Sequence, residues 1–212
     1  MLRKQFYETS RGRIAELLQK GGRTVDDVSS ELGLTASAVR AQLTAMERDG
    51  LVKRVGRIPG ITRPSQIFEL TPELEQLLSR AYIPFLTHLI HVFAQGLRRD
   101  ELNRLMQRTG KSLAAEFVGR KRAPGPMHAR VSAVSEFLNK ELGAVTRVVR
   151  RSGSLVIQGQ GCPLAALTDK EPSVCLAIES LVREMLGAPV RQCCDRAGRP
   201  RCCFEVRATD SR

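Results

Sequence analysis

Cysteine is the residue type with the clearest chemical potential in this 212-residue chain. All six cysteines lie between Cys162 and Cys203. The N-terminus has no apolar run followed by a cleavage site, which predicts a cytoplasmic protein. Thiols in a reducing compartment are more often metal ligands or redox groups than parts of a structural disulfide framework. The clustering therefore predicts one metal or redox site.

Four of the cysteines form two doublets, Cys193-Cys194 and Cys202-Cys203, on either side of a turn at residues 195–201. The segment is typical of a β-hairpin, in which neighbouring residues point to opposite faces. A hairpin centred on Gly198 places Cys194 opposite Cys202 and Cys193 opposite Cys203. One of these two cross-strand pairs can therefore join the site.

The other two cysteines, Cys162 and Cys175, lie near predicted helix N-termini, Cys162 before Pro163 and Cys175 after Pro172-Ser173. Backbone N–H groups and the helix dipole lower the pKa of a thiol there and favour an anionic centre. Four thiolates are then available, and thiolate-only coordination selects an iron–sulfur cluster or zinc. The spacing matches neither the zinc-ribbon pattern nor the ferredoxin run, so the residues alone leave both metals open.

The sequence around the cysteines predicts a mixed scaffold. A helix is expected from Met127 to Leu142, then strands over 146–151 and 154–158, and a second helix that opens at Ser173. The predicted fold class is α+β, and residues 126–212 are expected to form a Cys-rich α/β sensor domain.

The N-terminal third shows a different pattern. Helices are predicted from Ser10 to the Gly21-Gly22 stop, from Thr24 to Leu32 and from Ala36 to Asp49, followed by strands over 52–58 and 66–70. The third helix carries an inward stripe of Val39, Leu43 and Met46. Its outward face is polar and basic, which predicts contact with a polar partner.

The stretch from Leu34 to Val52, together with residues 63–71, closely resembles the winged helix-turn-helix of the ArsR, MarR and DeoR-like regulators. The resemblance implies that helix 36–49 lies in the major groove of DNA and that loop 57–63 is a wing at the phosphates. Arg40 and Gln42 carry groups that read base edges, and the cations of the strand pair suit phosphates. The predicted DNA-contacting residues, within a domain spanning residues 1–71, are Thr35, Ser37, Arg40, Gln42, Lys53, Arg54, Arg57 and Arg63. The alternative, a winged helix used for protein contacts, is disfavoured by the polar outward face.

Residues 72–125 are predicted to form helices that link the two ends. Thr71-Pro72-Glu73 is a helix start, and the apolar residues from Leu74 to Phe93 cover more than one helix face. A helix buried on two sides predicts dimerisation, so we expect a homodimer that binds a two-fold operator in double-stranded DNA. The longest apolar run, Ala81 to Phe93, is too short to span a bilayer, and no membrane partner is expected.

Charge and composition agree with a duplex partner. The formal net charge is +12, and it is spread over the whole chain rather than held in a tail. Aromatic residues make up only 4% and tryptophan is absent, which argues against a stacking platform for single strands. The chain has no nucleotide-binding glycine fingerprint and no Ser/His/Asp or Cys/His set, so it is not expected to be an enzyme.

A second resemblance bears on the choice of metal. The segments from Gly161 to Cys175 and from Pro200 to Val206 are similar to the sensor domain of the SufR-type iron–sulfur regulators. Such regulators are homodimers that bind a cluster through the C-terminal domain and control transcription, typically of iron–sulfur cluster assembly genes. The resemblance implies a transcriptional regulator, expected to be a repressor, with a four-iron four-sulfur (4Fe-4S) cluster held by Cys162 and Cys175.

The later ligands stay open between the members of each doublet. We favour Cys194 and Cys202, with Cys193 and Cys203 as alternatives. Two other hypotheses keep the DNA-binding half. In one, the metal is structural zinc or the thiols form a thiol–disulfide oxidant switch. In the other, the C-terminal domain responds to a small molecule, because it also resembles 4-vinyl reductase-type domains.

Overall fold

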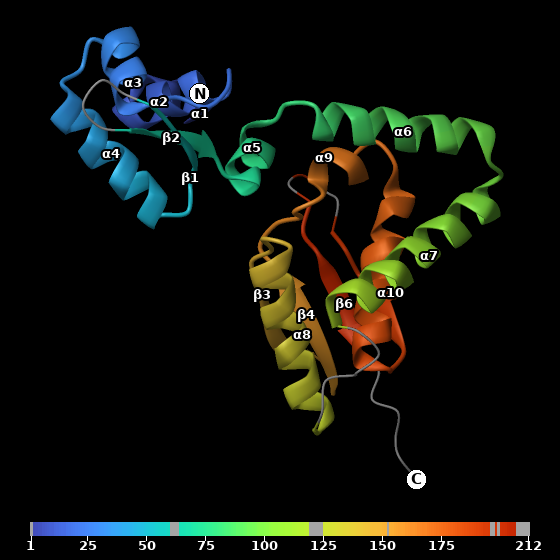
Figure 1. The fold of residues 1–212 in the computed structure, drawn as a ribbon. Coiled ribbons are helices and arrows are strands. Elements are labelled where there is room, and N and C mark those ends of the chain that lie inside the picture. Colours follow the sequence, from blue (N-terminus) through green and yellow to red (C-terminus); the bar gives the residue numbers. More distant parts are fainter. Residues whose placement is uncertain are drawn as a thin grey trace. The chain divides into compact units, whose positions relative to one another are not determined.

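The computed structural model describes residues 2–59, 64–118, 125–151, 153–195, 198 and 200–206. The chain divides into two compact units, residues 1–80 (unit 1) and residues 81–212 (unit 2), each with its own hydrophobic core (Figure 1). The mixture of helices and strands agrees with the predicted α+β class. The predicted division into residues 1–71, 72–125 and 126–212, with its central dimerisation region and C-terminal sensor domain, stays a prediction.

Unit 1 is a winged helix that begins with one additional helix. Its elements are α1 (Leu2–Glu8), α2 (Ser10–Leu18), α3 (Val25–Leu32), α4 (Ala36–Arg48), β1 (Val52–Ile58), β2 (Ser65–Leu70) and α5 (Pro72–Leu78). The three predicted helices correspond to α2, α3 and α4, and the predicted strands correspond to β1 and β2. Helix α1 was missed by the sequence analysis, because seven residues are too few to show a helical period.

Capping residues determine where the helices of unit 1 begin. The Thr24 side chain accepts a hydrogen bond from the Asp27 N–H, and the Asp27 carboxylate accepts one from the Thr24 N–H at 2.8 Å. This is the predicted capping box. Gly33 ends α3 at φ +64°, a left-handed conformation that glycine adopts without strain, and Thr35 caps α4 two residues later. The turn before α4 is therefore short, as in a helix-turn-helix.

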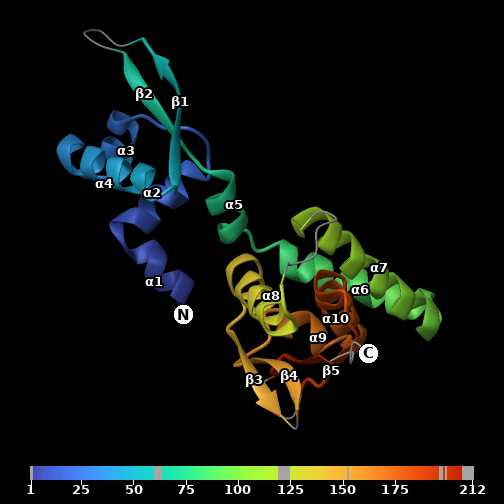
Figure 2. The ribbon, with the colours of Figure 1, turned by 90° about the horizontal axis from the view of Figure 1, so that it is seen from below.

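The core of unit 1 is aliphatic, and the hairpin extends beyond it. Val39, Leu43 and Met46 are fully buried, which confirms the predicted inward stripe of α4. Strands β1 and β2 pair antiparallel, with a bulge between Arg54 and Gly56. After its first residue β1 is exposed along its length, and the hairpin projects as a wing (Figure 2).

Unit 2 combines helices with a four-stranded antiparallel sheet. Its elements are α6 (Tyr82–Gly96), α7 (Arg99–Val118), α8 (Met127–Glu141), β3 (Thr146–Arg151), β4 (Ser154–Gly159), α9 (Ala165–Thr168), the 3-10 helix η1 (Pro172–Val174), α10 (Cys175–Leu186), β5 (Val190–Gln192) and β6 (Cys203–Val206). The strand order is β3-β4-β6-β5. The predicted helix over 127–142 and the predicted strands over 146–151 and 154–158 are confirmed, each within one residue.

One core joins the sheet of unit 2 to helices α8 and α10. Val134 and Leu138 of α8 share a buried cluster with Leu181 of α10 and with Ile157 and Phe204 of the sheet. Helix α7 lies against α10 at Gly110, where an added Cβ would overlap the Ala177 carbonyl oxygen and lie 2.7 Å from the Ser180 Cβ. The absence of a side chain at Gly110 therefore lets these two helix backbones approach closely.

The central apolar segment is broken into two helices. The predicted start at Thr71-Pro72 is confirmed, but α5 ends at Leu78 and α6 begins at Tyr82. No residue of α6 is buried in the single chain, so its predicted burial on two sides, which requires a second copy, stays a prediction. Among the described residues no single helix is long and apolar enough to cross a membrane, and α5 and α6 pass that test only as a broken pair.

Candidate functional site

Helix α4 presents a polar face to solvent. Thr35, Ser37 and Arg40 are exposed, as expected for residues that contact DNA. Gln42 is half-buried and lies at the edge of that face, because it is three residues from buried Val39 on the helix. The exposed face continues along α4 to Thr44 and Arg48, and its N-terminal half is the part that enters the major groove in a helix-turn-helix.

The cations of β1 differ in how they are held. Arg54 donates to Glu47 at 2.8 Å and lies 5.7 Å from the centre of the Phe68 ring, so α4 and β2 fix its position. Arg57 is exposed and donates to Gln66 at 3.4 Å. Lys53 is exposed and makes no ion pair among the described residues, and Arg63 lies outside them. Lys53 and Arg57 are thus the described wing cations that are most available to phosphates.

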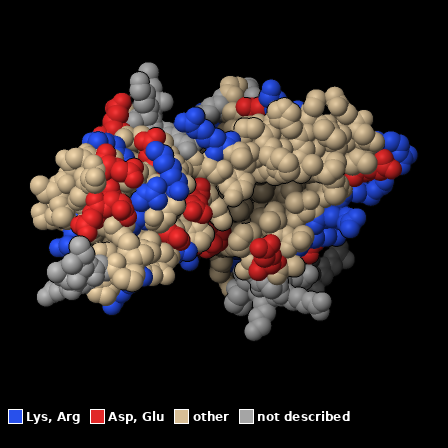
Figure 3. Space-filling view, turned by 45° about the horizontal axis from the view of Figure 1, so that its top comes forward, with Lys and Arg blue, Asp and Glu red and all other residues tan. Residues whose placement is uncertain are grey.

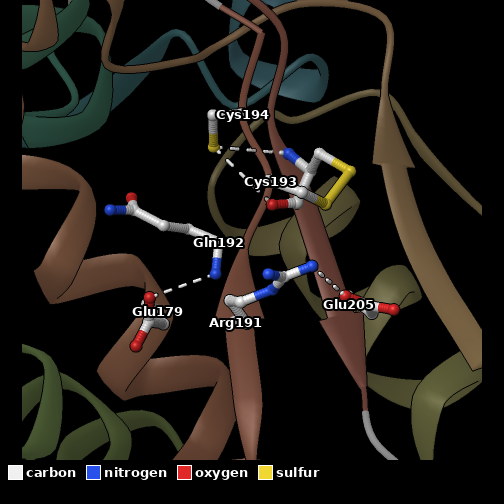
Figure 4. Close-up of a disulfide and its surroundings, with 7 residues drawn as sticks. Glu179, Arg191, Gln192, Cys193, Cys194 and Glu205 are labelled. Atoms are coloured by element: carbon white, nitrogen blue, oxygen red, sulfur yellow. Dashed lines mark hydrogen bonds and ion pairs between the residues drawn. A yellow bond between two sulfur atoms is a disulfide. The ribbon is translucent and has the colours of Figure 1, made fainter.

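The cysteine hairpin has the predicted register. Arg191 pairs with Glu205, Gln192 pairs with Phe204, and an isolated bridge joins Asp195 to Arg201. The cross-strand partners Cys193 and Cys203 form a disulfide. Figure 4 shows this disulfide on one side of the hairpin and the Cys194 side chain on the other. A disulfide offers no thiolate, so Cys193 and Cys203 are not available as ligands in this oxidation state, and the choice of ligands stays a prediction.

The four other cysteines carry thiols and line a single cavity of about 190 Å³. Cys162 precedes α9, Cys175 is the first residue of α10, and Cys194 and Cys202 belong to the hairpin. Apolar side chains supply most of the remaining wall, among them Leu113 of α7, Leu138 of α8 and Phe204 of β6. The structure thus brings together the four residues favoured as ligands, whereas metal binding by them stays a prediction.

Hydrogen bonds link three of these thiols. A hydrogen bond from the Cys202 thiol lowers the pKa of Cys162 to about 6, against the effect of burial and with help from the Leu164 N–H and the Thr168 hydroxyl. The bonds of Cys202 to Cys162 and Cys194, together with burial, raise the pKa of Cys202 itself. The hydrogen bond from Cys202 thus favours the thiolate form of Cys162. Among the described residues, no three His, Cys, Asp or Glu side chains are arranged to hold a single metal ion as they stand.

The segment between Cys162 and Cys175 is anchored by Glu171. The carboxylate of Glu171, which is 9% exposed, accepts from the Ser173 N–H at 3.0 Å and from Arg99 Nη1 at 2.9 Å. Burial on its own raises the pKa of Glu171, but the Ser173 N–H and the Arg99 guanidinium outweigh it and hold that pKa below its usual range. Glu171 was not among the predicted site residues. Its position directly before Pro172 is the local sequence signal that could have pointed to it.

The same segment contacts helix α6. Thr168 Oγ1 lies 3.8 Å from Cys162 Sγ, and the neighbouring Leu167 packs in one cluster with Ile90 and Ala94 of α6. Helix α9 therefore has one residue at the thiol cavity and the next against α6.

Comparison with known proteins supports the winged helix alone. Residues 8–56 match the DprA winged helix domain family, which is less than half of the chain. No curated protein matches. Unit 1 is therefore similar to a winged-helix domain, a fold compatible with DNA binding.

Proposed function

We propose that the protein is a DNA-binding transcriptional regulator, acting as a repressor, whose unit 2 senses iron–sulfur cluster or redox status and controls genes such as those for iron–sulfur cluster assembly. The observation that carries this proposal is the cavity, in which four thiols from three separate segments meet in an otherwise apolar wall. Such a wall excludes water and favours a ligand held by sulfur. The exposed polar face of α4 supplies the DNA-binding half.

The volume of the cavity supports a cluster rather than a single ion as the proposed ligand. A single zinc ion needs all its sulfur ligands about 2.3 Å from one point. The four thiols, together with mostly apolar side chains, line a cavity of about 190 Å³, which has room for a ligand with several metal atoms. Cys162, Cys175, Cys194 and Cys202 are the proposed ligands. A bound cluster would supply an oxidant-labile crosslink among these four thiolates.

Helix α9 supports the coupling between the cavity and the rest of unit 2. Cys162 and Cys175 bracket α9, and Leu167 of α9 packs against α6. When the four thiols are held together, α9 is fixed against α6, and when they are released that contact is free to change. Helix α6 is thereby the element with two arrangements, and the state of the four thiols determines which arrangement is populated.

Helix α6 also supports the proposed homodimer. Residues 81–96 contain no Asp, Glu, Lys or Arg. The exposed apolar residues of α6 are Tyr82, Ile83, Phe85, Leu86, Leu89, Val92 and Phe93. Figure 3 shows a broad surface without charged residues on this face of unit 2. An uncharged, apolar helix face suits a second copy of itself across a two-fold axis, the arrangement that places two recognition helices on one operator.

Anaerobic purification with iron, sulfide and zinc quantification and a visible spectrum tests the cluster. We expect iron and sulfide with broad visible absorption, lost in Cys175→Ser and kept in the double variant Cys193→Ser/Cys203→Ser. The double variant is the matched control, because it removes cysteines of the same hairpin that point away from the cavity. A colourless protein with zinc alone would refute the cluster, and equal loss in both variants would refute the assignment of the four cavity cysteines as its ligands.

A binding experiment tests the regulatory half. DNA selected from a random library by the anaerobic protein is titrated with the same protein before and after iron chelation, at fixed salt. We expect the affinity to change at least tenfold. Equal affinity would contradict cluster sensing and leave DNA binding intact, whereas failure to select any sequence would contradict the regulator itself.

The Cys193–Cys203 disulfide favours a second candidate, a thiol–disulfide switch that needs no metal. In this case reduction of that single disulfide changes DNA affinity. The Cys193→Ser/Cys203→Ser variant then has the DNA affinity of the reduced protein with or without reductant. If the variant still responds to reductant, the switch is elsewhere.

A further inference from the structure

Cys162 lies between two cavities. The inner one is the thiol-lined cavity described above, and a more open cleft of about 360 Å³ lies beside it. The two share Ala144, Cys162 and Pro163. Cys162 is the one cysteine among the four cavity thiols that lines the outer cleft, whereas Cys175 is 7% exposed at the start of α10. A solute that enters the outer cleft therefore reaches Cys162 before it reaches the other three cavity cysteines.

The wall of the outer cleft suits a small peptide-like molecule. Gly143 and Gly161 add no side chain to the wall, and Gln160 is its one side-chain amide among the described lining residues. None of the described lining residues is charged. The Gln160 amide can both donate to and accept from the amide groups of a short peptide, while the volume is too small for a folded partner.

Cys202 contacts Cys162 from the side of the thiol-lined cavity. Its thiol donates the hydrogen bond to the Cys162 sulfur, and its N–H donates to the Gly161 carbonyl at 3.3 Å. The backbone around Cys202 is thus held against the segment that carries Cys162. This contact gives Cys162 a second thiol within reach on the side away from the outer cleft.

We propose that in the metal-free protein Cys162 forms a mixed disulfide with a low-molecular-weight peptide disulfide that enters the outer cleft, and that Cys202 then resolves it. In the first step the Cys162 sulfur attacks one sulfur of the entering disulfide. That S–S bond breaks, and the leaving thiolate takes up a proton. In the second step the Cys202 sulfur attacks Cys162 Sγ and releases the second small thiol. Two protein thiols are oxidised to one disulfide, and the external disulfide is reduced to two thiols.

Oxidised glutathione is the probe for this proposal. The reduced, metal-free chain is incubated with it, remaining thiols are alkylated, and disulfides are mapped by mass spectrometry. We expect a Cys162–Cys202 disulfide without a lasting adduct in the wild-type chain. The Cys202→Ser variant should retain one glutathione on Cys162, and Cys162→Ser should give neither product. Cys194→Ser is the matched control, because it removes another cavity thiol and should leave the Cys162–Cys202 product unchanged.

Mapping of the wild-type chain decides the proposal even if a variant fails to fold. A first adduct on Cys175 or Cys194, or oxidation of Cys202 in Cys162→Ser at the wild-type rate, would overturn it. Neither outcome bears on iron and sulfide content or on DNA affinity, so this inference fails separately from the proposed function.

Discussion

Arg99 Nη1 lies 2.9 Å from Glu171 Oε1, an ion pair that joins the first turn of α7 to the segment between Cys162 and Cys175. The same carboxylate oxygen accepts from the Ser173 N–H, two residues before Cys175. Glu171 therefore positions the start of α10, and with it one of the cavity thiols, relative to α7.

The Glu171→Gln variant tests this anchor through its pH dependence. The folded-state pKa of Glu171 is lowered, so its contribution to stability is present above the unfolded value of about 4.3 and is lost as pH falls through the folded pKa. We expect Glu171→Gln to lose about 1 kcal/mol of stability at pH 7 and less near pH 3, measured by thermal unfolding. Glu184→Gln is the control, because Glu184 is exposed and lies 4.0 Å from Lys111. Equal losses in both variants would contradict the anchor.

The capping box of α3 is tested by Asp27→Ala. The Thr24 backbone N–H, the Thr24 hydroxyl and Arg23 lower the pKa of Asp27, so its contribution is present above about pH 4 and is lost on acidification. We expect a loss of about 1 kcal/mol for unit 1 at neutral pH, measured by urea denaturation. Asp26→Ala removes an acidic residue of the same helix turn that is not part of the box, and it should cost less. A larger effect at Asp26 would show that charge rather than capping matters.

The proposed DNA contacts separate into two classes by their response to salt and sequence. Lys53→Ala is expected to weaken binding to all sequences and to reduce the slope of log affinity against log salt by about 1. Arg40→Ala should instead cost about 1–3 kcal/mol of discrimination between the selected DNA and a scrambled duplex. Fluorescence anisotropy over a salt series measures both. Loss of discrimination in Lys53→Ala with none in Arg40→Ala would reverse the assignment.

The α7–α10 crossing is tested by Gly110→Ala. The added methyl group meets the Ala177 backbone and the Ser180 side chain, so the helices must separate. We expect a loss of about 1–3 kcal/mol in the stability of unit 2, measured by chemical denaturation. Gly96→Ala at the end of α6 is the control, because a Cβ there meets nothing within 4 Å. If the two variants are equally stable, the close approach of α7 and α10 is not needed.

The proposed dimer is tested by Phe85→Glu. Phe85 is 66% exposed, so a charge there should leave the protomer folded and disrupt an apolar interface between two copies. We expect the wild-type chain to sediment as a dimer and Phe85→Glu as a monomer. Val145→Glu, at a similarly exposed apolar position outside α6, should remain dimeric. A monomeric wild-type chain would rule out the interface.

Local signals in the sequence account for the parts of the fold that were predicted correctly. Thr24, Gly33 and Thr35 mark helix ends because caps and left-handed turns depend on neighbouring residues. The cross-strand relation of Cys193 to Cys203 also followed from the sequence, because the two-residue period of a strand and one turn centre fix the register. Residue type alone limited the chemistry of the C-terminal site to that of thiols.

The tertiary structure decided which of those thiols share a cavity. Cys194 and Cys202 meet Cys162 and Cys175 because α8 and α10 pack on one face of the sheet, a long-range choice that no local pattern encodes. The anchor at Glu171 and the outer cleft beside Cys162 likewise depend on packing between distant segments. The sequence by itself determined the winged helix, the cysteine chemistry and the hairpin register. Only the folded chain determined which sulfur atoms meet, because the cavity walls come from segments far apart in the chain.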